Sequence, residues 1–124
     1  MSQTTSFDLS KQLDEVAKSK GCELPISVMM WVKMTPNTHA VLFDQDYLRR
    51  MKTEPYWTCP RYTTDELFFA IYEAVYDPVQ LVMINRNVFN AYSLKYDKTV
   101  SADSASNALA KLAIYLIEND FWNR

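Results

Sequence analysis

The sequence predicts an α+β fold, with three helices and one antiparallel sheet of about four strands in the order α-β-β-loop-α-β-β-α. Two observations predict this class. Segments of alternating apolar and polar residues occur in pairs joined by short turns, and three other segments carry apolar residues at helical spacing. With 124 residues, 48% of them hydrophobic, the chain has the size and composition of a single domain spanning residues 1–124.

The first third of the chain predicts a helix followed by a hairpin. Residues 1–5 are polar and are expected to be frayed, and Ser6 can then cap a helix that ends at Gly21. Apolar residues alternate with others over residues 26–34, which predicts a strand. A Pro-Asn turn then leads to a second strand over residues 40–43.

Residues 44–62 lack periodicity, and we interpret them as a long connecting loop, a class of segment that is often functional. The loop interleaves aromatic with basic side chains: Tyr47, Tyr56, Trp57 and Tyr62 with Arg49, Arg50, Lys52 and Arg61. Such side chains anchor protein partners or bind nucleic acid. Three acidic residues, Asp44, Asp46 and Glu54, offset the four basic ones. A protein partner is therefore expected, and the alternative is that the aromatic residues fold back onto the core.

A middle helix is predicted over residues 64–76, because Thr63 and Glu66 form a capping box. Its apolar residues fall into two stripes, Leu67, Phe68, Ile71, Ala74 and Val75 on one side and Phe69, Tyr72 and Tyr76 on another. One stripe can pack on the sheet. The other is either covered by the first helix or exposed to a partner or to a second copy in a homodimer.

The last third predicts a hairpin and a closing helix. Residues 79–84 and 88–96 are expected to be strands joined by a tight turn. Residues 100–103 then lead into a helix with the longest apolar stripe of the chain: Ala105, Ala108, Leu109, Leu112, Ala113, Leu116 and Ile117. Phe121 and Trp122 follow it and either cap the core or join a contact surface.

Composition excludes several classes of function. The net charge of -2 does not fit nonspecific nucleic-acid binding, and no apolar run is long enough to span a membrane. The single glycine, Gly21, excludes the glycine-rich loops that hold phosphates. Cys22 and Cys59 lack the spacing of a metal or redox motif, and no secretory signal precedes them, so we expect reduced thiols in the cytoplasm, with no cofactor and no metal.

Catalytic groups are few. His39 is the only histidine, so a nucleophilic pair would have to join it to Cys59, with Asp44 or Asp46 orienting the imidazole. We favour structural roles for both residues. An acid/base or metal cluster would have to come from the carboxylates Asp44, Asp46, Asp65, Glu66 and Glu73, of which Asp65 and Glu66 already suit the helix N-terminus. No catalytic residue is predicted, and the chain is expected not to be an enzyme.

Two helix-opening motifs carry a family resemblance. Pro60-Arg61-Tyr62-Thr63-Thr64-Asp65 opens the middle helix, a hairpin follows, and Val100-Ser101-Ala102-Asp103 opens the last helix. Over about residues 60–118 the chain thereby resembles the phage ABA-sandwich domain, a family of small bacteriophage α/β proteins. The family has no established catalytic residues, so the resemblance implies no site. It implies a setting: a phage accessory protein that binds a host component, including inhibitors of bacterial defence such as anti-CRISPR proteins.

The predicted function is a non-enzymatic protein of phage or mobile-element origin that binds and blocks a host protein in the host cytoplasm. Partner contacts are predicted at Tyr47, Arg49, Arg50, Tyr56, Trp57, Arg61, Phe69, Tyr72 and Tyr76. The alternative is a small-ligand or nucleotide-binding module that sequesters a signal molecule, with Arg49, Arg50 or Arg61 on a phosphate and a Tyr or Trp on a base.

Overall fold

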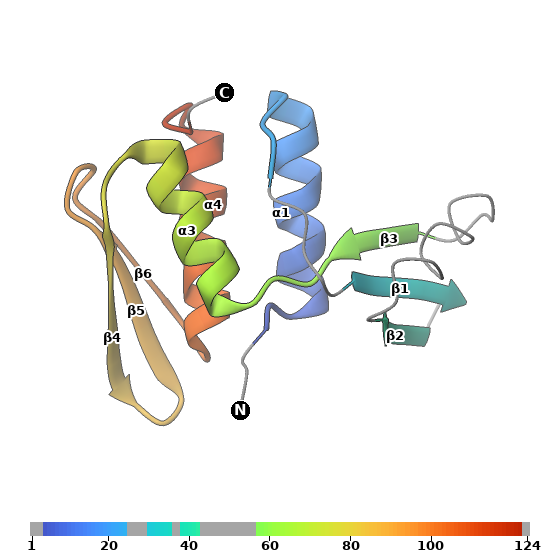
Figure 1. The fold of residues 1–124 in the computed structure, drawn as a ribbon. Helices are drawn as coiled ribbons and strands as arrows, with labels where there is room; N and C mark the ends of the chain where they lie inside the picture. The colour runs from blue at the N-terminus through green and yellow to red at the C-terminus, as the bar shows by residue number, and fades with distance from the viewer. Residues whose placement is uncertain (1–3, 25–29, 36–37, 43–56, 123–124) are drawn as a thin grey trace.

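The computed structural model describes residues 4–24, 30–35, 38–42 and 57–122, which form an α+β fold (Figure 1). The helices described are α1 (Phe7–Lys20), α3 (Thr64–Val75) and α4 (Ala105–Glu118). The strands form two antiparallel sheets of three strands each, ordered β2-β1-β3 and β4-β5-β6. Their bounds are Met30–Thr35 for β1, Thr38–Leu42 for β2, Trp57–Pro60 for β3, Val79–Asn85 for β4, Val88–Ser93 for β5 and Lys98–Ala102 for β6.

The prediction of one sheet with about four strands is wrong, because β3 and β6 complete two separate sheets. The interpretation of residues 44–62 as one loop is corrected at its end, where β3 pairs with β1 and places Trp57 opposite Lys33. Four residues are too few to show an alternating pattern, and Pro60 argues against a strand except at a sheet edge, where β3 lies.

The prediction of one strand over residues 88–96 is wrong for its last three residues. In the structure β5 ends at Ser93, and the chain reverses through a turn in which the Asp97 N–H donates to Leu94 O (3.3 Å). Asp97 takes the left-handed conformation (φ 48°), which Asp tolerates better than most residues. The following residues then pair back along β5, so that Val100 lies opposite Ala91.

The N-terminus of α1 is fixed by side-chain and backbone contacts. Ser6 caps the helix as predicted, and Gly21 ends it in the left-handed conformation (φ 68°). The expected fraying of residues 1–5 is wrong for the last two of them, and residues 1–3 lie outside the described residues. Thr5 is buried, its N–H donates to Tyr62 O (2.9 Å), and its Oγ1 accepts from the Tyr62 N–H (3.1 Å). Residues 4–6 therefore hold the segment that leads into α3.

The core lies around α4, which packs against α1, α3, β5 and β6. Its buried apolar side chains include Leu109, Leu112, Leu116 and Ile117. The buried Asn107 accepts from the Ser6 N–H (2.8 Å) and donates to Asp103 Oδ1 (2.8 Å), which joins the N-terminal ends of α1 and α4. Among the side chains described, no buried nitrogen or oxygen atom lacks a hydrogen-bond partner.

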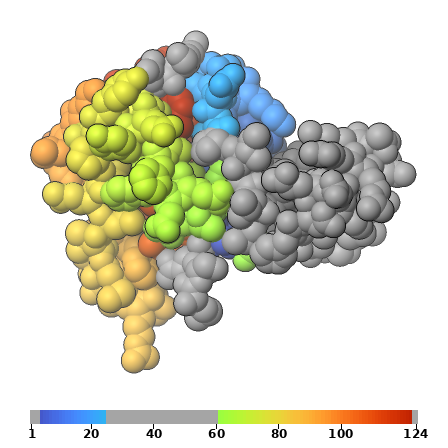
Figure 2. Space-filling model, in the orientation of Figure 1, coloured from blue at the N-terminus to red at the C-terminus, as the bar shows by residue number. Residues whose placement is uncertain are grey.

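The elements stack in layers across the molecule (Figure 1). The sheet β4-β5-β6 lies on one side of α3 and α4, α1 lies on the other side, and β3 contacts α1. In the space-filling view, α3 is in the yellow-green region that faces the viewer, and the β4–β5 hairpin projects below the helices (Figure 2). The outer side of α3 and the hairpin are thus open surfaces in this view.

Candidate protein-binding surface

The sequence positions α3 through its two ends. At the start, the Glu66 N–H donates to Thr63 Oγ1 (3.2 Å) and the Thr63 N–H donates to Glu66 Oε1 (2.9 Å), which confirms the predicted capping box. At the end, Tyr76 adopts the left-handed conformation (φ 55°), and its N–H donates to Tyr72 O (2.8 Å). This conformation is costly for a bulky residue, and such strain is typical of functional positions.

The outer side of α3 carries three exposed aromatic side chains. Phe69, Tyr72 and Tyr76 are 65%, 48% and 72% exposed. Their spacing of three and four residues places them on one side of the helix, where they form a stripe that we call the α3 surface. Leu67, Ile71 and Val75 on the inner side are buried. The two predicted stripes therefore have opposite environments.

The first helix does not cover the α3 surface. α1 packs against α4 and β3, and the main helical neighbour of α3 is α4. One interpretation of this second stripe is burial beneath the first helix. Within the described residues 4–24 and 57–122, the exposed fractions of Phe69, Tyr72 and Tyr76 exclude that interpretation. An aromatic stripe left exposed on a helix is typical of an interaction surface.

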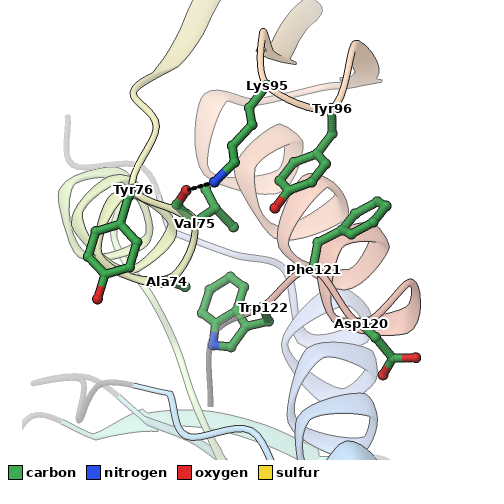
Figure 3. Close-up of a pocket in the computed structure, with 8 residues that line it drawn as sticks. All are labelled: Ala74, Val75, Tyr76, Lys95, Tyr96, Asp120, Phe121 and Trp122. Carbon is green, nitrogen blue, oxygen red and sulfur yellow. Dashed lines mark hydrogen bonds between the residues drawn. The ribbon is translucent and has the colours of Figure 1, made fainter.

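A surface hollow of about 550 Å³ lies at the C-terminal end of α3. Tyr76 lines it and also belongs to the α3 surface, so the two features are continuous. Figure 3 shows Trp122 between α3 and the stacked pair Tyr96 and Phe121, while the Lys95 side chain reaches down from the β5–β6 turn. The hollow thus has aromatic walls, one cationic side chain, Lys95, and one acidic side chain, Asp120.

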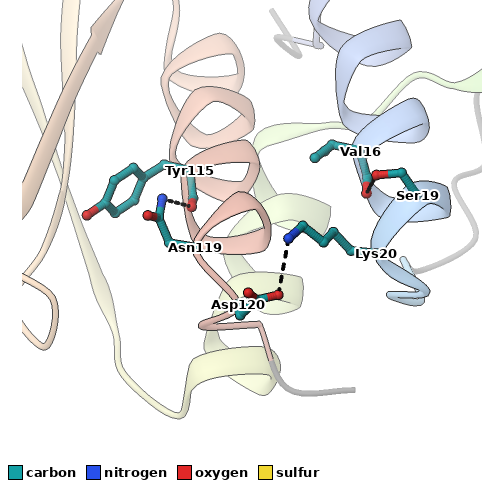
Figure 4. Close-up of polar contacts among 6 residues, drawn as sticks. All are labelled: Val16, Ser19, Lys20, Tyr115, Asn119 and Asp120. Atoms are coloured by element: carbon teal, nitrogen blue, oxygen red, sulfur yellow. Dashed lines mark hydrogen bonds and ion pairs between the residues drawn. The ribbon is translucent and has the colours of Figure 1, made fainter.

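The wall formed by Phe121 is held by the end of α4. Asp120 adopts the left-handed conformation (φ 61°), and the Phe121 N–H donates to Leu116 O (2.9 Å). This reversal sets Phe121 against Tyr96, with ring centroids 4.1 Å apart. Lys20 Nζ contacts Asp120 Oδ1 at 3.4 Å and ties this end of α4 to α1 (Figure 4). The buried Trp122 caps the core, as one of the two interpretations of this segment predicted.

Acidic residues dominate the charge around the α3 surface. Residues 64–78 include Asp65, Glu66, Glu73 and Asp77 and contain no Lys, Arg or His. Lys95 lies at the end of α3, where its Nζ donates to Val75 O (2.9 Å) while its backbone N–H donates to Asp77 Oδ2 (3.0 Å). The surface therefore combines aromatic rings with negative charge.

The only clear pKa shift among the described residues lies near this acidic region. The Tyr92 hydroxyl donates to Asp97 Oδ1 (3.1 Å). This hydrogen bond raises the pKa of Tyr92 above its usual value, and desolvation and the charges of Asp97 and Asp77 add to the effect.

Most of the predicted loop contacts cannot be placed on this surface. Tyr47, Arg49, Arg50 and Tyr56 lie outside the described residues, and for Trp57 the structure describes only its place in β3. Arg61 is half-buried, and its Nε donates to Thr4 Oγ1 (2.5 Å). Tyr62, an aromatic residue of the predicted loop, is buried in the core. Of the predicted contact residues, the structure brings together Phe69, Tyr72 and Tyr76.

The strand register bears on the proposed nucleophilic pair. His39 lies opposite Lys33 on one side of β1, and Cys59 lies opposite Trp31 on the other side. The backbones of His39 and Cys59 are therefore separated by two strand spacings, about 10 Å, across the sheet. They are also offset from each other along β1. The proposed orienting residues, Asp44 and Asp46, lie outside the described residues.

Within the described parts of the chain, no group of three or more His, Cys, Asp or Glu side chains could hold a metal ion, and Cys22 is a free thiol. No helix described here is long and apolar enough to cross a membrane.

Sequence reasoning missed the hollow as a feature. The predicted strand over residues 88–96 includes Lys95 and Tyr96, which lie in the β5–β6 turn of the structure. The sequence signal for this turn is Asp97, a turn-forming residue that directly follows Tyr96.

The chain matches no family model, and neither a curated protein nor a solved structure shows significant similarity to it. A function for the chain therefore has to be argued from its own surface.

Proposed function

We propose that this chain is a non-enzymatic binding protein that docks on a host protein through the α3 surface and blocks it. The observation that carries the proposal is the stripe formed by Phe69, Tyr72 and Tyr76, whose side chains are 48% to 72% exposed on a helix whose inner side packs in the core. Tyr and Phe are enriched at protein interfaces because they bury a large area and lose little side-chain entropy. Binding of a partner would remove this area from water.

The hollow gives the proposed contact an anchor point. Residues that dominate binding energy commonly insert into a pocket near the centre of an interface. The hollow of about 550 Å³ beside Tyr76 can accept one large side chain from the partner. A partner helix or loop would then lie along Phe69 and Tyr72 and place its anchor in the hollow beside Tyr76.

The charges define the partner's chemistry. Asp65, Glu73 and Asp77 accompany the aromatic stripe, so the matching partner surface is basic and presents Arg or Lys next to apolar side chains. Arginine suits this role because it pairs with carboxylates and also stacks on aromatic rings. Nucleic acid does not suit it, because phosphates and carboxylates repel each other.

The biological setting rests on the resemblance to the phage ABA-sandwich domain. It supports a phage or mobile-element protein that acts in the host cytoplasm on a bacterial defence component, in the manner of an anti-CRISPR inhibitor. The acidic character of the surface suits such a target, because defence proteins that hold nucleic acid present basic surfaces.

Capture from a bacterial lysate, followed by affinity measurement on the captured protein, tests the proposal. Phe69→Ser and Tyr72→Ser should each weaken binding about 30-fold, the effect of losing an interface residue worth about 2 kcal/mol. Glu73→Lys should weaken it as well, and more strongly at low salt than at high salt.

Leu94→Ser provides the matched control, because Leu94 is 67% exposed, like Phe69 at 65%, but lies in the β5–β6 turn. It should leave the affinity unchanged. Equal loss for Leu94→Ser and Phe69→Ser, or equal capture by wild type and both α3 variants, would contradict the α3 surface as the docking site.

The hollow also favours the second candidate, a small-ligand module. Tyr76 and the open side of the Tyr96–Phe121 pair could contact a planar ring, with Lys95 near an attached anion and Asp120 in the same lining. This site differs from the predicted one, which placed the phosphate on Arg49, Arg50 or Arg61. Thermal unfolding in the presence of a nucleotide panel decides it: a bound ligand at 100 times its Kd adds about 2.7 kcal/mol to the free energy of unfolding. Unchanged melting temperatures would exclude this candidate.

A further inference from the structure

The edge of the second sheet carries a feature that the α3 surface does not use. β4 is the outermost strand of the order β4-β5-β6, and in the described part of the chain it pairs with β5 alone. An edge strand presents a row of main-chain N–H and C=O groups that can pair with another strand. Figure 1 shows β4 running along this side of the molecule from the end of α3 to the hairpin.

β4 carries few of the devices that usually protect an edge. Its seven residues, VQLVMIN, include no charged residue and no proline. Val82, Met83 and Ile84 are 47%, 67% and 56% exposed, so the outer half of the strand is apolar and in water. The register with β5 shifts between Met83 and Asn85, at the hairpin end, and leaves Val79 to Met83 regular.

The opposite edge, β6, is protected. It begins with Lys98, its exposed positions are the polar Thr99 and Ser101, and Lys111 Nζ donates to Ser101 O (3.0 Å). A charged strand with an occupied carbonyl is a poor template for another strand. The two edges of one sheet thus differ in their readiness to pair.

We propose that β4 pairs antiparallel with β4 of a second copy of this chain, so that the two sheets join into one sheet of six strands. Pairing about a twofold axis at Val82 would place Val82 opposite itself and Leu81 opposite Met83 of the second copy. The exposed apolar side chains of each copy would then cover those of the other. The proposal is independent of the α3 surface.

Charge at the strand ends favours a second copy over a foreign strand. Asp77 precedes β4 and Arg86 follows it, and the strand between them is neutral. In the pair centred on Val82, Arg86 lies opposite Pro78 of the second copy, next to the Asp77 of that copy, and the same contact repeats at the other end. A strand with opposite charges at its two ends thus complements itself only when antiparallel.

Sedimentation equilibrium on wild type and on variants at position 82 tests the pairing. Wild type should shift from monomer to dimer as its concentration rises, and Val82→Thr, which keeps the shape and β propensity, should do the same. Val82→Lys and Val82→Glu should each remain monomeric, because like charges would meet at the twofold axis. An equimolar mixture of these two variants should regain a dimer of one copy of each.

Circular dichroism of the variants should show that they are folded, because Val82 is exposed. The inference is overturned if wild type stays monomeric up to about 1 mM, the weak end of useful affinities. It is also overturned if Val82→Lys dimerises like wild type or if the mixture stays monomeric. Phe69→Ser should still dimerise, and loss of the dimer in that variant would assign the contact to α3 instead.

Discussion

The two sides of α3 have similar hydrophobicity but different environments. The inner side places Leu67, Ile71 and Val75 in the core against α4, while the outer side leaves Phe69 and Tyr72 in water. Both sides are apolar enough to drive burial. Folding buries one of them, and the other stays exposed, as the proposed docking requires. The comparison shows that two apolar sides of one helix can have different environments when the neighbouring elements cover only one of them.

The largest difference between the two sides should appear in stability. Ile71→Ala removes a fully buried side chain (0% exposed) and should lower the free energy of unfolding by about 2–5 kcal/mol. Tyr72→Ala, at the next position and 48% exposed, should change it by no more than about 0.5 kcal/mol. Urea denaturation of the two variants measures both values. Similar losses would mean that the outer side is also packed.

Loss of the capping box should lower the free energy of unfolding by an intermediate amount, because the box orients α3 and therefore both of its sides. Thr63→Ala removes the hydroxyl that accepts from the Glu66 N–H and should cost about 1 kcal/mol of the free energy of unfolding. Thr64→Ala, one position later, is the control and should cost less, since the Thr64 hydroxyl is not part of the box. Equal costs would show that the box does not stabilise α3.

Glycine substitutions at Tyr76 and Tyr72 should change the free energy of unfolding in opposite directions. Tyr76→Gly relieves a left-handed tyrosine (φ 55°) and should raise the free energy of unfolding by up to about 1 kcal/mol. Tyr72→Gly places glycine inside the helix and should lower it by about 1 kcal/mol. Tyr76→Gly should also weaken partner binding. A destabilised Tyr76→Gly would mean that the tyrosine side chain contributes to the fold and is not kept for binding.

Local signals in the sequence were enough to predict the helices. The caps at Ser6 and Thr63 and the left-handed Gly21 are each set by a few neighbouring residues, and the structure has all of them. The α+β class also follows from such signals. β3 and β6 could not be predicted, because each is short and is defined by its partner strand rather than by its own pattern.

The site was predictable only in part, for a related reason. The sequence identified Phe69, Tyr72 and Tyr76 as a second stripe, but their exposure depends on where α1 packs, which is a property of the whole fold. The hollow depends on the reversal at Asp120 and on the β5–β6 turn, which lie far apart in the sequence. Tyr62 and Arg61, predicted within the loop, instead join the N-terminal segment to α3.

Site-specific photocrosslinking tests the central claim most directly. A photoreactive phenylalanine analogue placed at Tyr72 should crosslink to one host protein, and the same analogue at Leu94, which is 67% exposed but lies off the α3 surface, should not. The crosslinked peptide of the host protein should be rich in Arg or Lys, as the acidic surface requires. Crosslinks of equal yield from both positions, or none from Tyr72 while the complex is intact, would contradict docking through α3.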